Sequence, residues 1–334
     1  NMLKFSNHVG LDIGSSVIKL VQVELVGDGG KYRLVALGQA KTPVVAERAE
    51  AIKKLVKDIK VTSHQAVISL PESQVYTRVI QTPILPEGEL TQAIRWQAEQ
   101  YIPVPLADAV LKHQVLNEED GKLNVLLVAA PNTLLNTYVN MLTNAGFETV
   151  AIETEILAVS RALVGEDVNS PTTMIVHVGA ESTTLSVLSR GDLVLTQSIS
   201  TGGTAVTRSL MAALGLEVGQ AEEYKKIYGM DETKLEGKVV SAIKSVVDLL
   251  VAELKRVLAF YNVHGAKNPV KRLVLSGGTA LMPGLVPYLT LNLNIEVQIG
   301  SPFLLVNLTD KQKQEIGDNA TLYSTAVGLA LKPT

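Results

Sequence analysis

The strongest constraint on the fold is a repeated unit of three β-type segments joined by short turns and followed by helical spacing. The first copy spans 8–59, and the second starts at 172 and continues into a helix from Thr204. Self-similar units of this kind indicate two related halves. A chain of 334 residues also exceeds one ordinary hydrophobic core. The sequence therefore predicts two lobes of mixed sheet and helix.

Composition supports this interpretation and excludes several classes of function. Apolar residues make up 46% but aromatic residues only 4%, so the core must consist mainly of Val, Leu, Ile and Ala, as in sheets covered by helices. Net charge is -3 without a concentrated basic stretch, which argues against a nucleic-acid partner. Cysteine is absent, and the five histidines lack metal-ligand spacing. Every long charge-free stretch is broken by Pro, Gly or Asn, so we expect a cytoplasmic protein without direct membrane insertion.

Three loops rich in glycine and hydroxyl residues each follow a β-type segment. They lie at 9–19 (VGLDIGSSVIK), 174–184 (MIVHVGAESTT) and 273–284 (LVLSGGTALMPG). Small residues let backbone N–H groups approach phosphate oxygens, and hydroxyl groups add donors. Three such loops in two similar halves predict one nucleotide pocket shared between the lobes.

The first loop carries the residues that we expect at the phosphates. Gly14, Ser15 and Ser16 supply donors, and Asp12 faces the gap where hydrated Mg²⁺ binds. Lys19 lies one strand away, within reach of a β- or γ-phosphate. The alternative for this loop alone is a β-hairpin with a solvated Asp and Lys.

The other two loops complete the predicted pocket. The second contributes backbone donors from the opposite lobe: Gly179, Ala180, Glu181 and Ser182. In the third, Gly277 and Gly278 leave room for an adenine or ribose against the backbone, although a glycine pair after a strand is also an ordinary turn.

In order and wording, these loops resemble the phosphate-1, phosphate-2 and adenosine motifs of the actin-like ATPase superfamily. Residues 200–203 (STGG) resemble its first connecting motif and 326–330 (AVGLA) its second. The resemblance implies ATP and Mg²⁺ as cofactors. It adds Gly202, Gly203 and Thr279 to the expected nucleotide-binding residues.

Within that superfamily, the chain resembles the PilM family of type IV pilus assembly proteins. The segment 179–183 (GAEST), the helix that ends at 98–103 (AEQYIP) and an insertion at 72–150 carry this resemblance. The helix at 221–225 (AEEYK) implies that Glu222 and Lys225 contact ribose and base. An exposed i,i+3 ion pair is the alternative for these two residues.

We accordingly expect an α/β, two-lobed actin-like ATPase fold with duplicated sheet-plus-helix units and a small inserted α+β subdomain, called IC. The expected subdomains are IA (1–71 and 151–168), IC (72–150), IIA (169–214 and 268–319), IIB (215–267) and a C-terminal helix that returns to IA (320–334).

One departure from the superfamily pattern bears on catalysis. The phosphate-2 motif usually starts with Asp, which helps to hold Mg²⁺ and the attacking water, but here His177 stands in that position. Because a neutral imidazole suits Mg²⁺ poorly, we expect at most slow ATP turnover. Glu153 and Glu155 lie near the place of a water-orienting residue and are the candidate catalytic groups; an exposed carboxylate at a helix start is the alternative.

The resemblance implies a cytoplasmic ATP-binding scaffold that docks the N-terminal tail of a PilN-like membrane protein between subdomains IA and IC. It also implies recruitment to the inner-membrane pilus platform and contact with the pilus motor ATPases. The stretch 96–103 is either part of this groove or only the core-facing helix of the insertion. The alternative functions are a filament-forming ATPase like FtsA or MreB, which sedimentation with ATP would reveal, and a sugar or acetate kinase, for which the chain offers no clear Asp base.

Overall fold

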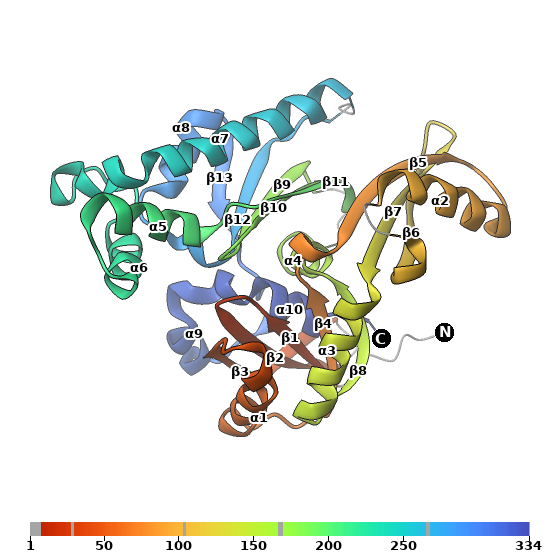
Figure 1. Cartoon of the computed structure of the whole chain (residues 1–334), viewed down its shortest axis with the longest axis horizontal. Coiled ribbons are helices and arrows are strands. Elements are labelled where there is room, and N and C mark those ends of the chain that lie inside the picture. Colours follow the sequence, from red (N-terminus) through yellow and green to blue (C-terminus); the bar gives the residue numbers. More distant parts are fainter. Residues whose placement is uncertain (1–7, 28–29, 103–104, 166–169, 265–267, 334) are drawn as a thin grey trace.

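The computed structural model describes residues 8–27, 30–102, 105–165, 170–264 and 268–333. Two lobes, each built on a twisted sheet, lie one above the other, and a smaller sheet stands beside them (Figure 1). The first sheet has the order β14-β3-β2-β1-β4-β8. Its strands are β1 (Val9–Ile13), β2 (Val17–Val26), β3 (Lys31–Lys41), β4 (Gln65–Leu70), β8 (Glu148–Thr154) and β14 (Val306–Asn307).

The second sheet repeats the design of the first. Its order is β11-β10-β9-β12-β13. Its strands are β9 (Thr173–Val178), β10 (Thr183–Ser189), β11 (Asp192–Ile199), β12 (Arg272–Ser276) and β13 (Glu296–Ile299). In both sheets an antiparallel meander of three strands pairs with a later strand in parallel, β1 with β4 and β9 with β12. The duplication predicted from the sequence is thereby confirmed.

Helices cover both sheets. They are α1 (Arg48–Asp58), α2 (Glu87–Tyr101), α3 (Asn132–Ala145), α4 (Glu155–Leu163), α5 (Gly203–Leu214), α6 (Val218–Ile227), α7 (Lys238–His264), α8 (Leu285–Leu293), α9 (Asp310–Ile316) and α10 (Ser324–Ala330). The long helix α7 buries Val239, Ile243, Val247 and Leu254 against the second sheet, because residues three or four apart share one helix face.

Helices α4 and α10 cross between the two sheets at very short range. A Cβ on Gly328 of α10 would lie 1.8 Å from the carbonyl oxygen of Ala158 in α4. On the other side of α10, a Cβ on Gly10 of β1 would lie 2.0 Å from the carbonyl oxygen of Ala326. Val159 of α4 packs with residues of the second sheet, so this helix joins the cores of both lobes.

The inserted part of the chain forms a third sheet of order β5-β7-β6. Its strands are β5 (Tyr76–Pro83), β6 (Ala109–Glu119) and β7 (Lys122–Pro131), and α2 packs on it through Leu90, Ile94 and Ala98. The sheet also reaches the second lobe, where the Asn117 side-chain amide donates to Asp192 at the start of β11 over 2.7 Å.

The structure corrects one expectation about this insertion. We expected the helix and strand before residue 150 to belong to the inserted module, but β8 pairs with β4 of the first sheet. Leu142 of α3 and Phe147 share a core with Ile52 of α1. The local sequence identifies a strand, but long-range pairing decides which sheet it joins, so the mistake lay in grouping and not in the elements.

Candidate nucleotide-binding site

Asp12 and Lys19 form a shielded ion pair at the end of the first sheet where β1 turns into β2. The two residues face each other across the β1–β2 hairpin, and Lys19 Nζ lies 2.8 Å from Asp12 Oδ2. The Asp12 side chain is only 7% exposed and that of Lys19 15%. The pair is therefore not the solvated Asp and Lys of the alternative interpretation.

The turn between β1 and β2 presents its hydroxyl groups outward. Ser15 and Ser16 are exposed, whereas the Gly14 carbonyl accepts a hydrogen bond from Thr42 Oγ1 over 2.8 Å. A Cβ on Gly14 would lie 2.8 Å from the Val17 carbonyl oxygen, so a side chain here would force the turn open. The turn is therefore tightly held while its donors remain accessible.

The second glycine loop and the first connecting segment are joined by backbone hydrogen bonds. Gly203 N–H donates to the Gly179 carbonyl over 2.9 Å, and Thr204 N–H donates to the Ala180 carbonyl over 2.8 Å. A Cβ on Gly202 would lie 2.5 Å from the Ala180 carbonyl oxygen. Ser182 closes the loop by accepting from the Gly179 N–H. Glu181 accepts a hydrogen bond from the Thr204 hydroxyl over 2.9 Å.

Lys225 and Glu222 of α6 reach this same place. Lys225 is 7% exposed, and its Nζ donates to the Gly203 carbonyl over 3.2 Å, to Thr207 Oγ1 over 2.9 Å and to Glu222 Oε1 over 2.7 Å. Burial raises the pKa of Glu222, but hydrogen bonds from Lys225 and Thr207 and the Lys225 charge outweigh it, so the pKa lies below its ordinary value. Lys225 is therefore buried and held by three partners, whereas the Glu222 side chain is 38% exposed, so the pair is half-buried and differs from the fully exposed ion pair of the alternative.

The third glycine loop contacts both lobes. Gly277 has a φ of +87°, and a Cβ there would lie 2.3 Å from the Val178 carbonyl oxygen, so only glycine fits. A Cβ on Gly203 would lie 2.4 Å from the Thr279 hydroxyl, and one on Gly278 would lie 3.2 Å from the Leu322 side chain. The structure thus brings the second and third loops and α6 together, as predicted.

His177 lies on β9 across from the Asp12–Lys19 pair. Its Nδ1 is 3.1 Å from Ser276 Oγ on the neighbouring strand β12. The pKa of His177 is lowered to about 4, first by burial; the Asp12 charge opposes this shift and the Lys19 charge adds to it. At neutral pH the imidazole is therefore uncharged. An Asp side chain at this position would carry a negative charge, which the imidazole does not provide.

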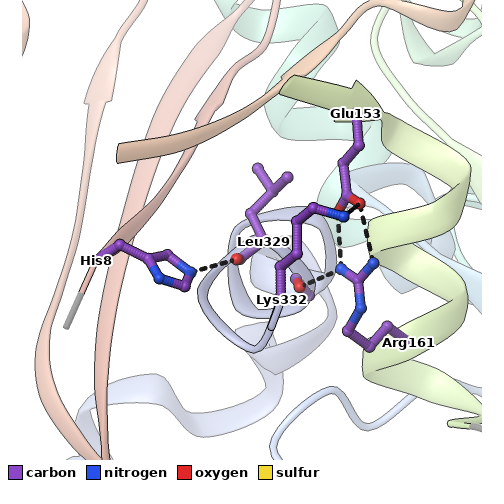
Figure 2. A network of polar contacts seen from close by, with 6 residues as sticks. His8, Glu153, Arg161, Leu329 and Lys332 are labelled. Atoms are coloured by element: carbon purple, nitrogen blue, oxygen red, sulfur yellow. Dashed lines mark hydrogen bonds and ion pairs between the residues drawn. The ribbon is translucent and has the colours of Figure 1, made fainter. Parts of the chain in front are cut away.

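The two candidate glutamates have different environments. Glu153 accepts from both terminal nitrogens of Arg161, over 2.7 and 2.9 Å, and from Lys332 Nζ over 2.9 Å. Arg161 also donates to the Gly328 carbonyl, and His8 Nε2 lies 3.0 Å from the Leu329 carbonyl oxygen (Figure 2). Glu153 is thus engaged in an ion-pair network that joins β8, α4 and the segment after α10, which makes Glu155 the stronger candidate for a general base.

Glu155, the first residue of α4, remains the candidate base. The pKa of Glu155 is raised to about 8, first by burial and then by the negative charges of Asp12 and Glu72. The Glu72 N–H and the Lys19 charge act in the opposite direction. A carboxyl group with a pKa near neutral, close to Asp12 and Lys19, is suited to accept a proton from water.

Sequence reasoning missed two residues of this site, Glu72 and Tyr138. Glu72 follows β4 and is 5% exposed. Tyr138 of α3 has its pKa raised to about 12, first by burial, with the Arg48 charge opposing and the Glu155 and Asp12 charges adding to it. Glu72 could have been found, because an acidic residue just after a strand parallel to β1 lies at the same sheet edge as Asp12. For Tyr138 the sequence held no signal.

The described residues contain neither a ready-made metal site nor a membrane-spanning helix. No group of three or more His, Asp or Glu side chains is arranged to bind a metal ion directly. Among the same residues, no helix has the length and apolar character to cross a membrane.

Two sheet-and-helix lobes that close over glycine loops define the actin-like ATPase fold. MreB5 of Spiroplasma citri bound to AMPPNP is 12% identical, with a TM-score of 0.52 over 96% of this chain and 94% of that one. Cell division protein FtsA of Neisseria meningitidis serogroup B is 22% identical over 96% of this chain and 88% of its own length.

Within this class, the particular family is clear from two further findings. The family model described as type IV pilus assembly protein PilM matches residues 10–334, and the chain belongs to this family. A solved PilM–PilN type IV pilus biogenesis complex contains a chain 27% identical to this one, with a TM-score of 0.84 over 98% of both chains. The family predicted from the loops and the insertion is thereby confirmed.

Proposed function

We propose that this PilM-family protein binds ATP with Mg²⁺ between its lobes and serves as a scaffold for the inner-membrane pilus platform. The observation that carries the nucleotide site is the convergence of Gly203, Lys225 and Thr279 beside the second and third loops. A Cβ at Gly203 would collide with Thr279, so a side chain is excluded where loops and α6 meet. The bound AMPPNP of the MreB5 structure supports a nucleotide in this fold.

Each group of the site has a role that its chemistry allows. Lys19, now paired with Asp12, would hold a phosphate oxygen, and Asp12 would hold water of the Mg²⁺ shell. Backbone donors of the first and second loops would hold the phosphates, and Glu222 and Lys225 would lie at the ribose and base. Glu155 would accept the proton of the attacking water. The chemistry that Mg²⁺ would supply here is neutralisation of phosphate charge.

The second part of the proposal is docking of the N-terminal cytoplasmic tail of a PilN-like protein between the first lobe and the insertion. The PilM–PilN complex supports it. On α2, Leu90, Ile94 and Ala98 face the insertion core, but Trp96 is 66% and Tyr101 43% exposed. These aromatic side chains are available to a peptide, whereas Pro103 lies outside the described residues.

Such docking would recruit the protein to the inner face of the cytoplasmic membrane and place it near the pilus motor ATPases. Subdomains IA and IC, in the proposed division of the chain, would form the two walls of the peptide groove. Neither location requires a membrane-spanning segment in this chain.

Calorimetric titration tests both parts of the proposal. We expect MgATP to bind the nucleotide-free protein, and we expect a PilN-like N-terminal peptide, added first, to change the ATP affinity because coupled sites affect one another reciprocally. Peptide binding without ATP binding would reject the nucleotide site and leave an adaptor. If neither ligand bound, the scaffold proposal would be rejected, and only the assignment of the fold would remain.

The variant His177→Asp should turn over ATP faster than the wild type, by roughly tenfold, which corresponds to about 1.4 kcal/mol of barrier. The physical reason is the restored carboxylate beside Asp12, which helps to order Mg²⁺ and the attacking water where the neutral imidazole cannot. Steady-state phosphate release at saturating MgATP is the measurement.

His177→Asn is the matched control, since it is polar and similar in reach but brings no charge. Its turnover should stay near the wild-type rate. Equal rates in the Asp variant and the wild type would show that His177 is not what limits hydrolysis.

A further inference from the structure

The buried glutamate Glu72 lies where three parts of the molecule meet. It follows β4, which is flanked by β1 and β8 in the first sheet, and all three strands run in parallel. Their carboxyl ends therefore carry Asp12, Glu72 and Glu155 to one edge of the sheet. Glu72 is 5% exposed, and both carboxyl oxygens are shielded from solvent without a hydrogen bond of standard geometry. A carboxyl group this deeply buried is costly, and the fold gives it no compensating ion pair among the described residues.

Glu72 and the first turn of α4 support each other. The Glu72 N–H donates toward the Glu155 carboxyl group, and the Ile156 N–H favours the charged form of the Glu72 carboxyl group. The residue before α4, Thr154, makes no side-chain cap to the helix. Glu72 thus approaches the first turn of α4 from a separate segment of the chain and helps to fix Glu155.

The insertion approaches Glu72 at Thr77 on β5, whose hydroxyl group is buried and, like the Glu72 carboxyl oxygens, has no hydrogen bond of standard geometry. Burial raises the pKa of Glu72 to about 7, and the nearby Thr77 hydroxyl acts in the opposite direction by favouring the charged form. The neighbouring Ile156 side chain packs with Leu126 of the insertion and Leu193 of the second lobe. Glu72 and Ile156 together place the insertion, the second lobe and the candidate base in direct contact.

We propose that Glu72 is a positioning residue that couples the inserted three-stranded sheet to Glu155. This rests on the proposed function, because Glu155 is the group expected to act on the attacking water. A partner that shifts β5 relative to α4 changes the contact between Thr77 and Glu72 and, through it, the charge and direction of Glu155. The insertion thereby controls whether Glu155 is charged and oriented to accept a proton, although the insertion does not contact the nucleotide.

The charge link is tested in the ligand-free protein by carboxyl ¹³C NMR titration with labelled glutamate. The signal lost in Glu155→Gln belongs to Glu155, whose surroundings carry the charges of Asp12, Glu72 and Lys19 and the Tyr138 hydroxyl. Removing the Glu72 charge with Glu72→Gln should lower the titration midpoint of that signal by roughly one pH unit, as expected when a nearby like charge is removed. An unchanged midpoint would overturn the proposal.

The link to the insertion is tested with Thr77→Val, which keeps the shape and removes the hydroxyl. Since that hydroxyl favours ionised Glu72, the midpoint of the signal lost in Glu72→Gln should rise; an unchanged midpoint would also overturn the proposal. Glu118→Gln, an exposed change on β6, is the control and should move neither signal. A purely structural role would alter thermal stability alone. Because no nucleotide is present, failure of these titrations is separate from failure of ATP binding, which calorimetry reports.

Discussion

Gly328→Ala is expected to destabilise the protein by about 3 kcal/mol or more, the upper range for overpacking of a tight core. The new Cβ would lie 1.8 Å from the Ala158 carbonyl oxygen and 2.4 Å from its carbonyl carbon. These are backbone atoms of α4, so no side chain can turn aside to make room. Either α10 or α4 must shift, and both are fixed between the two sheets. Thermal unfolding followed by circular dichroism should show a midpoint lower by roughly 5 °C or more.

Gly219→Ala is the matched control for the glycine change. Gly219 also lies in a helix, α6, but a Cβ there would meet nothing within 4 Å. Alanine is the better helix former, so this variant should keep or slightly raise the unfolding midpoint. Equal midpoints for the two alanine variants would contradict the close crossing of α4 and α10.

Glu153→Ala is the second change with a large expected effect, a loss of about 3–5 kcal/mol in the free energy of unfolding. The Glu153 side chain is 4% exposed, and its loss leaves the Arg161 and Lys332 cations in a poorly solvated place (Figure 2). Among the described residues, the Gly328 carbonyl would remain as the hydrogen-bond acceptor of Arg161. Chemical unfolding monitored by tryptophan fluorescence of Trp96 and by circular dichroism gives the comparison.

The control for this variant is Glu24→Ala. Glu24 pairs with Arg33 over 2.7 Å, but both side chains are more than half exposed, so this loss should be about 0–1 kcal/mol. Replacing Glu153, Arg161 and Lys332 together by apolar residues of similar size should restore much of the stability, because no unpaired charge remains. A loss in Glu153→Ala as small as in the surface control would mean that the network contributes little.

The nucleotide loops could be predicted from the sequence because their signal is local. Each consists of consecutive residues directly after a strand, and the φ of +87° at Gly277 is a local reason for glycine. The contact with Val178 of β9, which also leaves no room for a Cβ at Gly277, could not be predicted locally. The second sheet repeats the antiparallel hairpins of the first, so the strand arrangement predicted for one lobe also predicts that of the other. The family assignment followed from the same local wording and is confirmed.

The roles of the two glutamates could not be separated from the sequence. The sequence placed both Glu153 and Glu155 at the start of a helix, so they were equivalent candidates. Helix α4 begins at Glu155, and this change of backbone direction leaves Glu153 with Arg161 and turns Glu155 toward Asp12. Lys332, the other partner of Glu153, is 179 residues away in sequence, beyond the reach of any local pattern.

The placement of α10 against β1 has a consequence for the order in which the chain folds during synthesis. The strands of the second sheet all come from 173–299, one continuous stretch, whereas the first sheet takes β14 from 306–307 and its cover from α10 (Figure 1). The second lobe can therefore fold while the ribosome is still extending the chain. In the first lobe, the face of Gly10 that packs against α10 stays uncovered until α10 has been synthesised. Of the described elements, β1 comes first in the sequence and α10, which covers it, comes last, so the first lobe is completed after the second.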